Sequence, residues 1–380
     1  MFRRWAGISA IAGALQQKVW SYTSDFIYPN LYVVLVGPSG VGKTRAIKPV
    51  AKMWREIDAL SVSPNSLTKA SLIDSLAECR RDIVNHARTP PLTQFNSLLC
   101  PITELDVLLK SYDTEFMSVL TDIYDVVPYE ERRRGKDLHI KIDRPQLNIL
   151  GGTTPAALFR FMPDEGWEMG FASRTILIFS EEASQQPIFS GNIQGSERLY
   201  ERLLHDLKLI SADAFFGQMV WDSKAIDRLE DWKRSGSRPE PTHPKLVSYN
   251  SRRVAHLLKL SMIASVSRGS DFKITEGDYE VALGWLIEAE MYMEDIFVAK
   301  TSGGDTKHID DCVHFIIGLW RKDQRPVPEQ RVQRFLGQKV LSIHIRFVID
   351  AMIASGRVQV RPDPKNPEYR LFLPKLNGKA

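Results

Sequence analysis

The sequence predicts an α/β protein with a doubly wound parallel sheet, and three observations indicate this class. The run Tyr32–Val36 (YVVLV) is continuously apolar, which is typical of a central parallel strand buried on both faces. A glycine-rich segment, GPSGVGKT, follows at residues 37–44, and residues 44–57 have a helical pattern despite Pro49. Further apolar strands then alternate with helices as far as Phe179, which is the order of a parallel sheet covered by helices.

The same alternation predicts the individual elements of this sheet. We expect strands at 32–36, 61–66, 97–103, 147–150 and 174–179, and helices at 44–57, 68–81 and 116–124. Beyond Glu181 the pattern becomes helical, with a polar linker at 184–196 and a helix at 197–210. Residues 267–273 (SRGSDFK) then separate two further helices.

These patterns divide the chain into five segments. We expect an N-terminal helical segment that packs on the core through an amphipathic helix, an α/β core, a helical region, a Ser/Gly linker and a small C-terminal domain. Their predicted bounds are residues 1–30, 31–183, 184–300, 301–307 and 308–380. In the last segment, helices at 310–321, 329–336 and 342–355 precede two short strands around a turn rich in Pro, Asp and Asn, which predicts a winged helix.

The composition is that of a soluble globular protein, with 43% hydrophobic and 25% charged residues. A net charge of +4 means that contact with nucleic acid depends on local basic patches. The three cysteines form no CxxC pair and have no histidine at metal-ligand spacing, which favours a reducing cytoplasm. No segment approaches the ~20 apolar residues of a membrane-spanning helix, so we expect no membrane association.

The segment GPSGVGKT has the form GxxxxGK[ST] of a phosphate-binding loop. Its glycines let backbone N–H groups surround phosphate oxygens, Lys43 adds a positive charge, and the Thr44 hydroxyl reaches a magnesium ion. We therefore expect ATP and Mg²⁺ as ligands, and a glycine-rich turn without nucleotide is the alternative. The residues expected to hold the nucleotide are Gly37, Pro38, Ser39, Gly40, Val41, Gly42, Lys43 and Thr44.

Hydrolysis of a triphosphate requires a carboxylate that orients the attacking water. Glu104 follows the strand at 97–103, where a doubly wound sheet presents functional groups, and is the leading candidate. Asp106 and Asp122 are alternatives. Thr103 occupies the place that an aspartate usually holds, and we expect it near the metal.

Two later positions are expected to sense the terminal phosphate. The segment LNILGGTTP at 147–155 has two hydroxyl residues near its end. Thr154 is the expected sensor, and Thr153 is the second choice. Helix capping is the alternative role for these threonines. Arg174 precedes the fifth strand and is placed to reach a neighbouring subunit's nucleotide as a charge-stabilising arginine.

Together these motifs resemble the AAA+ helicase core, most closely the helicase-like ATPases encoded by phages, plasmids and integrated mobile elements. The resemblance covers most of residues 5–300 and rests on a PNLYVVLVGPSGVGKT-like segment, a strand ending in Thr-Glu, LNILGGTTP and a G-x-x-SR element. These begin or fall at Pro29, Thr103, Leu147 and Gly170. The minichromosome-maintenance helicases are similar more distantly, because their SRF arginine finger matches SRT at 173–175.

The resemblance implies an AAA+ fold with a helical lid and a second sensor arginine. Arg252 stands at the matching position, with Arg253 as a close alternative and a solvated helix face as the other explanation. Arginine fingers of such families act between subunits, which implies a homo-oligomeric ring, with a hexamer as the expected number. The replacement of the metal-side aspartate by Thr103 departs from the family pattern.

Basic residues before the fourth strand predict a contact with DNA. The segment EERRRGKDLHIKIDRP at 130–145 forms a hairpin that is expected to hold phosphates without reading bases, and a solvated loop is the alternative. The residues of this contact are Arg132, Arg133, Arg134, Lys136 and Lys141. The winged helix offers a second set, although packing on the ring or binding a partner protein is an equal alternative: Lys339, His344, Arg346, Arg357, Arg361, Lys365 and Arg370.

The sequence therefore predicts an ATP-hydrolysing, ring-forming helicase or translocase that acts on single-stranded or forked DNA during replication of a phage or mobile element. The alternative is an AAA+ switch that loads a helicase, regulates transposition or serves in defence without unwinding. A structural DNA-binding protein is disfavoured by the intact phosphate-binding loop.

Overall fold

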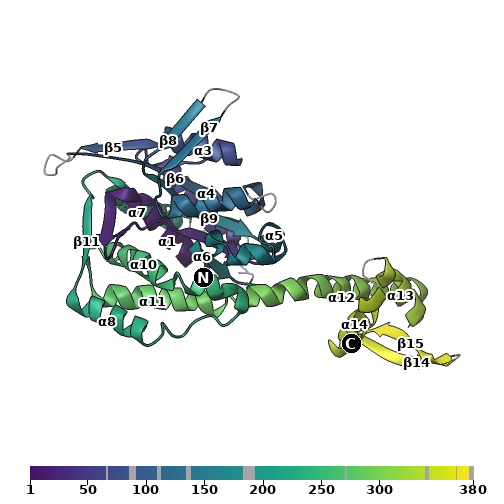
Figure 1. Cartoon of the computed structure of the whole chain (residues 1–380). Coiled ribbons are helices and arrows are strands. Elements are labelled where there is room, and N and C mark those ends of the chain that lie inside the picture. Colours follow the sequence, from purple (N-terminus) through teal and green to yellow (C-terminus); the bar gives the residue numbers. More distant parts are fainter. Residues whose placement is uncertain are drawn as a thin grey trace. The chain divides into compact units, whose positions relative to one another are not determined.

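A computed structural model describes the chain as two compact units, Met1–Ile296 and Phe297–Ala380 (Figure 1). The described part excludes residues 66, 85–90, 109–112, 134–137, 183–192, 270–271, 339–341, 365 and 376–380. No helix within the described part has both the length and the apolar stretch that crossing a bilayer requires.

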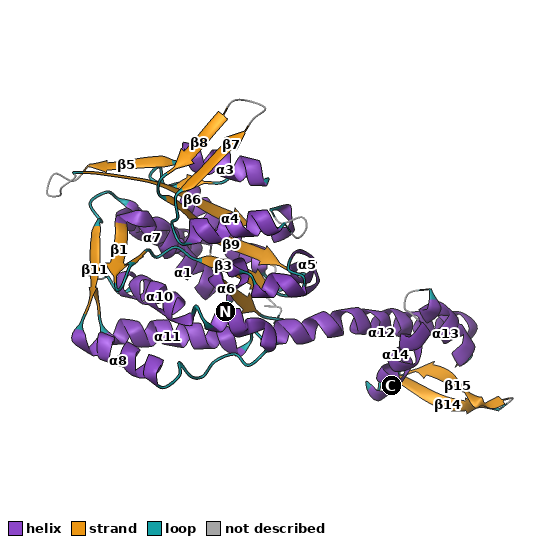
Figure 2. Cartoon of the chain, viewed as in Figure 1, coloured by secondary structure: helices purple, strands orange, loops and turns teal. Residues whose placement is uncertain are grey.

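A mostly parallel sheet lies at the centre of the first unit (Figure 2). Its parallel strands, in spatial order, are β10 (Thr175–Phe179), β3 (Tyr32–Val36), β9 (Pro145–Thr153), β6 (Leu92–Ile102) and β4 (Ser61–Val62). A further strand, β5 (Arg80–Val84), pairs antiparallel with β6. Every residue of β3, β9 and β10 is buried. The predicted α/β class and the five predicted strands are confirmed, and β6 and β9 are longer than the sequence suggested.

Helices cover this sheet, and the N-terminal helix α1 (Phe2–Leu15) is among the most buried. It contacts α2 (Lys43–Arg55), α7 (Ile193–Ser211) and α10 (Arg253–Ser267). The expected packing on the core is confirmed, but the helix is buried on nearly all sides rather than amphipathic, because these neighbours surround it. The helix α2 continues through Pro49.

The remaining helices of the first unit connect or cover the strands. They are α3 (Lys69–Glu78), α4 (Thr114–Tyr124), α5 (Pro155–Phe161), α6 (Gly170–Arg174), α8 (Ser223–Arg234), α9 (Val247–Asn250) and α11 (Glu276–Met291). Short 3₁₀ turns occur at Gln16–Lys18, Leu105–Val107, Asp164–Glu168 and Pro244–Leu246. A hairpin of β7 (Tyr129–Arg133) and β8 (Leu138–Ile142) stands out at the top of this unit in Figure 1.

A second sheet joins the N-terminal segment to the region predicted to be wholly helical. Its order is β12 (Lys273–Ile274), β11 (Gly217–Trp221), β1 (Val19–Tyr22) and β2 (Phe26–Ile27), and β1 pairs in parallel with β11. The prediction that residues 184–300 contain only helices is therefore wrong. Strand pairing here joins segments about 200 residues apart, so no local sequence pattern reports it.

The second unit packs three helices against a small antiparallel sheet. Its elements are α12 (Asp295–Asp323), which begins at the boundary between the units, α13 (Glu329–Gly337), α14 (Ser342–Ala354), β13 (Val327–Pro328), β14 (Val358–Asp363) and β15 (Asn366–Pro374). The strand order is β13-β15-β14, and the core includes Ile316, Val348 and Phe372. The expected three helices and two strands are confirmed.

The predicted flexible linker at residues 301–307 is wrong, because α12 remains helical through it. Glycine costs roughly 1 kcal/mol relative to alanine in a helix interior, and a Ser/Gly composition therefore weakens a helix without ending it. Helical segments on both sides of these residues continue the same backbone hydrogen bonding.

Candidate functional site

Three parallel strands end at one edge of the central sheet and border a cavity of about 320 Å³. Strand β3 leads into the loop of residues 37–42, β6 ends before Thr103, and β9 ends at Thr153. Because the carboxyl ends of parallel strands meet at the same edge, residues distant in sequence come together there. The cavity is lined by Ser39, Gly40, Lys43, Thr44, Thr103, Glu104, Asp106, Gly152, Thr153, Thr154, Ala157 and Arg160.

The loop between β3 and α2 depends on glycines for its shape. Gly40 and Gly42 have φ angles of 89° and 96°, a left-handed conformation that side chains with a Cβ rarely adopt. The first turn of α2 has no side-chain cap, so its N–H groups remain available to an anion. Lys43 Nζ donates to the carbonyls of Gly37 at 2.6 Å and Pro38 at 2.7 Å, which holds the ammonium against the loop.

The lysine and the candidate carboxylate interact across the cavity. Burial lowers the pKa of Lys43 from its usual value, and attraction to the Glu104 carboxylate opposes this shift. Glu104 is exposed and follows β6 by two residues, as predicted from the sequence. The alternative Asp106 also lines the cavity, whereas the alternative Asp122 lies in α4 and does not.

The side chains around the cavity fit a magnesium ion that is shared with a bound phosphate. Among the described residues, no group of three or more His, Cys, Asp or Glu is arranged to hold a metal alone. Thr44 and Thr103 bring hydroxyls to the cavity, and Glu104 and Asp106 bring carboxylates. Mg²⁺ commonly retains several waters and binds through few protein oxygens plus substrate phosphates, so this sparse donor set fits it.

The turn after β9 adds hydroxyls and an arginine to the cavity. Thr154 Oγ1 accepts a hydrogen bond from Ala157 N at 3.3 Å, so this threonine caps α5. Helix capping was the alternative to phosphate sensing, and Thr154 also lines the cavity. Thr153 Oγ1 donates to the Thr154 carbonyl at 3.4 Å. Arg160 is exposed and lies one turn beyond Ala157, and among the described residues none forms a hydrogen bond or ion pair with its side chain.

Sequence reasoning missed Arg160. The available signal is its spacing from Ala157, because residues i and i+3 of a helix lie on the same face. Ala157 is the residue whose N–H donates to the capping Thr154. An exposed arginine in a seven-residue helix otherwise resembles any surface arginine.

Arg174 lies at the opposite edge of the sheet. It ends α6 directly before β10, whose first residue, Thr175, pairs with Tyr32, and whose last, Phe179, pairs with Val36. The phosphate-binding loop follows Val36, so roughly 17 Å of strand separates it from Arg174 at about 3.3 Å per residue. Arg174 is therefore placed away from the cavity of its own chain.

At that edge, Arg174 is buried beside a single carboxylate. Its Nε donates to Asp125 Oδ2 at 3.1 Å, and its Nη1 donates to the Gly170 carbonyl at 3.0 Å. Arg252 lies 3.5 Å from the same Asp125 oxygen, and 37% of its side chain is exposed. The predicted arginine finger Arg174 and the predicted second sensor Arg252 thus share one carboxylate, and neither lines the cavity.

A third cation lies in the same cluster. Lys259 is buried, donates to Asn30 Oδ1 at 2.7 Å, and has its ammonium 4.0 Å from the centre of the Tyr124 ring. Burial lowers the pKa of Lys259 to about 7, and the Asp125 carboxylate opposes this shift. Three basic side chains therefore surround one acid, which leaves an excess of positive charge when Lys259 is protonated.

Arg253, the alternative second sensor, has a structural role instead. Its side chain is 1% exposed, and its Nε and Nη2 each lie 2.7 Å from a Glu290 oxygen. Nη2 also donates to the Pro239 carbonyl at 2.6 Å. The buried ion pair joins α10 to α11 and uses the whole guanidinium, and Arg253 does not line the cavity, so its contact with nucleotide stays a prediction that this arrangement does not support.

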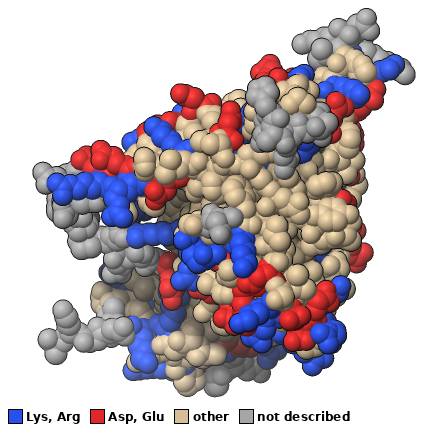
Figure 3. Space-filling model, turned by 90° about the vertical axis from the view of Figure 1, so that its left-hand side faces the viewer, with Lys and Arg blue, Asp and Glu red and all other residues tan. Residues whose placement is uncertain are grey.

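The β7–β8 hairpin places some of its basic residues outward. In the strand register Arg132 lies opposite His139, and Glu130 lies opposite Lys141. Because successive side chains of a strand point to opposite faces, these four share the outer face of the hairpin. The side chains of Arg132 and Lys141 are 78% and 62% exposed. Acidic residues accompany them, since Arg132 lies near Glu130 and Lys141 near Asp143. Figure 3 views the molecule from the left-hand side of Figure 1 and shows basic and acidic side chains interspersed around a broad uncharged area. Arg134 and Lys136 lie outside the described residues.

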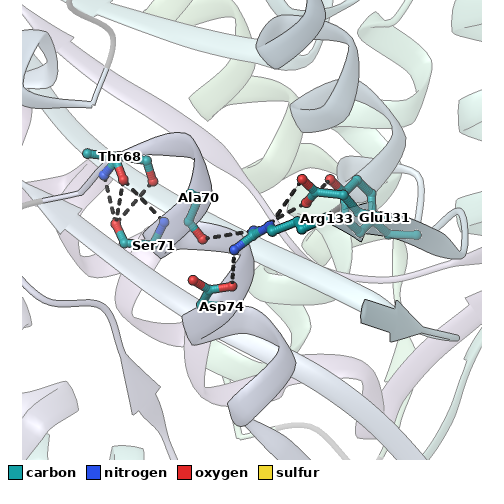
Figure 4. A network of polar contacts seen from close by, with 7 residues as sticks. Thr68, Ala70, Ser71, Asp74, Glu131 and Arg133 are labelled. Atoms are coloured by element: carbon teal, nitrogen blue, oxygen red, sulfur yellow. Dashed lines mark hydrogen bonds and ion pairs between the residues drawn. The ribbon is translucent and has the colours of Figure 1, made fainter. Parts of the chain in front are cut away.

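Arg133 faces the fold instead of the solvent (Figure 4). Its Nη1 donates to Asp74 on α3 at 2.7 Å, and its Nε donates to Glu131 at 3.2 Å. A weaker hydrogen bond at 3.4 Å reaches the Ala70 carbonyl, and a capping box of Thr68 and Ser71 begins the same helix. Two acids, Glu131 of β7 and Asp74 of α3, compensate the charge of Arg133, so the predicted contact of Arg133 with DNA stays a prediction that these ion pairs oppose.

In the second unit, too, some basic residues form ion pairs and others are exposed. Arg370 donates to Glu329 at 2.9 Å and to Asp350 at 3.1 Å, and Arg357 pairs with Asp310. His344, Arg346 and Arg361 are exposed, whereas Lys339 and Lys365 lie outside the described residues.

The cavity at the carboxyl edge can bind a metal-bound polyphosphate and orient a water toward it. It combines a lysine, hydroxyls at the start of α2 and two carboxylates. No model of a known protein family matches the sequence, and no curated protein is significantly similar to it. The assignment of a function therefore depends on the motif and on this geometry.

The cluster beside Arg174 predicts a loss of stability in acid. His256 is fully buried, its Nε2 lies 3.0 Å from the Ser173 carbonyl, and burial lowers its pKa to about 3. Below about pH 6.5 the unfolded chain gains a proton at this imidazole that the folded chain does not, so the free energy of unfolding falls by roughly 2 kcal/mol between about pH 8 and 5.

The variant His256→Gln isolates this effect. Urea unfolding of both proteins at about pH 8 gives the packing cost of the substitution, and the change in their difference toward about pH 5 gives the titration. The variant is expected to lose about 2 kcal/mol less than the wild type over this range. An equal loss in both proteins would show that the folded protein protonates this histidine.

Proposed function

We propose that this protein is a ring-forming AAA+ ATPase that acts as a DNA helicase or translocase, of the kind that phages and mobile elements use for replication. The observation that carries the proposal is the single cavity in which the loop GPSGVGKT meets Glu104 and Thr154. The resemblance of these motifs to the AAA+ helicase core supports the proposal. Under this proposal the protein acts on DNA in the cytoplasm.

Each residue of the cavity has a role in this proposal. Lys43 exchanges its loop carbonyl contacts for phosphate oxygens, and the Thr44 hydroxyl binds the metal beside Thr103. A bound Mg²⁺ ion neutralises charge on the β- and γ-phosphates. Glu104 orients the attacking water, and the Thr154 hydroxyl senses the terminal phosphate while it caps α5.

The position of Arg174 and Arg252 supports assembly into a ring. Both lie at the amino edge of the sheet, too far from the cavity of their own chain, and both pair with Asp125. A neighbouring subunit that presents its nucleotide to this edge would supply phosphate charge to a cluster that holds more cations than anions. We infer a closed homo-oligomer, with a hexamer as the simplest ring of this family.

The nucleic-acid contacts divide between the two units. In the first, Arg132 and Lys141 on the outer face of the hairpin hold the phosphate backbone. In the second, three helices and an antiparallel sheet support the winged-helix assignment, with Arg346 and Arg361 exposed for a partner. An ATPase switch that loads a helicase is the second candidate, and a strand-displacement assay separates the two.

Substitutions at the cavity test the chemistry. Lys43→Ala is expected to abolish nucleotide binding, whereas Glu104→Gln should bind ATP and hydrolyse it at least ~100-fold more slowly, because it keeps the shape and loses the charge that orients water. Equilibrium binding of labelled ATP and steady-state phosphate release measure the two effects. Asp106→Asn is the matched control, and normal turnover in Glu104→Gln with loss in Asp106→Asn would transfer the role to Asp106.

A second substitution tests the arginine that the sequence did not reveal. Arg160→Ala is expected to lower kcat/KM for ATP by roughly tenfold or more, since it removes a positive charge from the phosphate side of the cavity, and Arg160→Lys should recover part of the loss. Arg55→Ala is the control, because Arg55 lies at the other end of α2 and pairs with Asn65 at 3.0 Å. Equal kinetics for Arg160→Ala and the control would place Arg160 outside the reaction.

Mixing variants tests the action of Arg174 between subunits. Arg174→Ala and Lys43→Ala are each expected to be inactive, but mixed rings contain sites with an intact Lys43 facing an intact Arg174. Steady-state ATP turnover of the mixture should therefore exceed that of either variant alone. Native mass spectrometry establishes that the two co-assemble, and co-assembly without any recovered turnover would contradict action in trans.

A further inference from the structure

A second cavity, of about 410 Å³, lies at the other end of the central sheet. Its walls come from the small sheet, from the start of β6, from the turn before β9 and from the residue before β11. Seven residues line it: Gln17, Trp20, Phe26, Tyr28, Thr93, Arg144 and Phe216.

This cavity is separate from the phosphate site. Arg144 directly precedes β9, and Thr153 ends the same strand in the other cavity. The nine residues of β9 span roughly 25 to 30 Å at about 3.3 Å each. A nucleotide whose phosphates lie on the loop after β3 therefore does not place its base here.

Aromatic rings form most of the wall. Trp20 and Phe216 meet edge to face with centroids 5.4 Å apart, and Phe26 is 57% exposed at the rim. Flat π-surfaces of this kind stack on planar heterocycles, and every nucleobase presents such a face.

Arg144 is the cation of this cavity and is fixed at both ends. Its Nη2 donates to the Tyr28 hydroxyl at 2.9 Å, its guanidinium carbon lies 5.7 Å from the Tyr28 ring centre, and its carbonyl accepts from Gln17 Nε2 at 2.9 Å. No carboxylate within the described residues pairs with Arg144. A positioned guanidinium beside aromatic rings, without an acid to neutralise it, suits a ligand that is both planar and anionic.

The chain connects this cavity to the basic hairpin. Strand β8 ends at Ile142, two residues before Arg144, and the exposed Lys141 precedes that end. The hairpin and Arg144 are thus neighbours in the chain, and the length of β9 separates both from the phosphate site.

We propose that the aromatic cavity binds a nucleobase of single-stranded DNA, with Arg144 against the adjoining phosphate. The inference rests on the DNA-binding part of the proposed function and does not depend on ATP hydrolysis. Its occupant is a base within a polyanionic strand, because neither a purely apolar ligand nor a cation matches Arg144.

The test compares strands with and without bases. Binding of the full chain to a short labelled single-stranded oligonucleotide is measured by fluorescence anisotropy over a range of salt, without ATP, beside an abasic strand of the same length. Phe26→Ala should weaken binding of the base-containing strand by roughly tenfold with an unchanged salt slope, because stacking carries no charge. The same variant should leave the abasic strand unaffected.

Arg144→Ala should weaken both strands and reduce the salt slope by about one. Tyr28→Phe retains the ring and should keep most of the affinity, and Tyr292→Ala is the matched control, since Tyr292 is an exposed aromatic outside the cavity. Phe26 is already mostly exposed, so its replacement removes little buried area, and thermal melting verifies the fold of each variant.

A 2-aminopurine base within the oligonucleotide gives a direct readout. Its fluorescence should be quenched on binding to the wild type, through stacking, and less so on binding to Phe26→Ala. If Phe26→Ala binds the base-containing strand as tightly as the wild type and quenches 2-aminopurine equally, the inference is overturned, as it is by a wild-type chain that binds no single strand.

These outcomes are separable from those of the proposed function. If Phe26→Ala weakens binding of the base-containing strand as expected while the wild type hydrolyses no ATP, the base-binding cavity stands and the motor does not. If DNA stimulates ATP turnover equally in the wild type and in Phe26→Ala, the motor stands and the cavity is not a base site.

Discussion

Parallel pairing of β3 with its two neighbours is the constraint on which both ends of the first unit depend. Tyr32 lies opposite Ile149 and Thr175, and Val36 lies opposite Thr153 and Phe179. Because all three strands run in one direction and are fully buried, every chemical group that follows them falls at one edge, and every group that precedes them falls at the other. The fold therefore separates Lys43 from Arg174 by the length of a strand.

This separation has an electrostatic consequence. At the carboxyl edge Lys43 has the Glu104 carboxylate to interact with. At the amino edge the described residues offer Arg174, Arg252 and Lys259 one common counterion, Asp125, and burial already lowers the pKa of Lys259 to about 7. A phosphate brought to this edge would relieve the imbalance, whereas a free subunit has no phosphate of its own within reach. Under the proposed function, the fold itself thus makes hydrolysis depend on a neighbour.

The part of the site that the sequence predicted is the part in which a motif follows an apolar strand. The phosphate-loop segment, Glu104 and Thr154 lie within two residues of the end of such a strand, so local pattern was enough to bring Lys43, Thr44, Glu104 and Thr154 to one cavity. Arg160 and the aromatic cavity escaped prediction for different reasons. Arg160 lies on a short helix whose exposed face has no pattern, and the aromatic cavity collects residues from segments about 200 positions apart. The small sheet was missed for the same long-range reason.

The β7–β8 hairpin exposes fewer of its basic side chains than its sequence contains. With a period of two residues, Arg133 turns toward Asp74 while its neighbour Arg132 turns outward, although the two are chemically identical in the sequence. On the outer face, Glu130 pairs with His139 at 2.7 Å and reduces the positive field further. Phosphate contacts through this hairpin are therefore few, and salt screens exposed contacts strongly. A base that stacks in a cavity contributes affinity without charge, which is why the aromatic cavity and the hairpin complement each other.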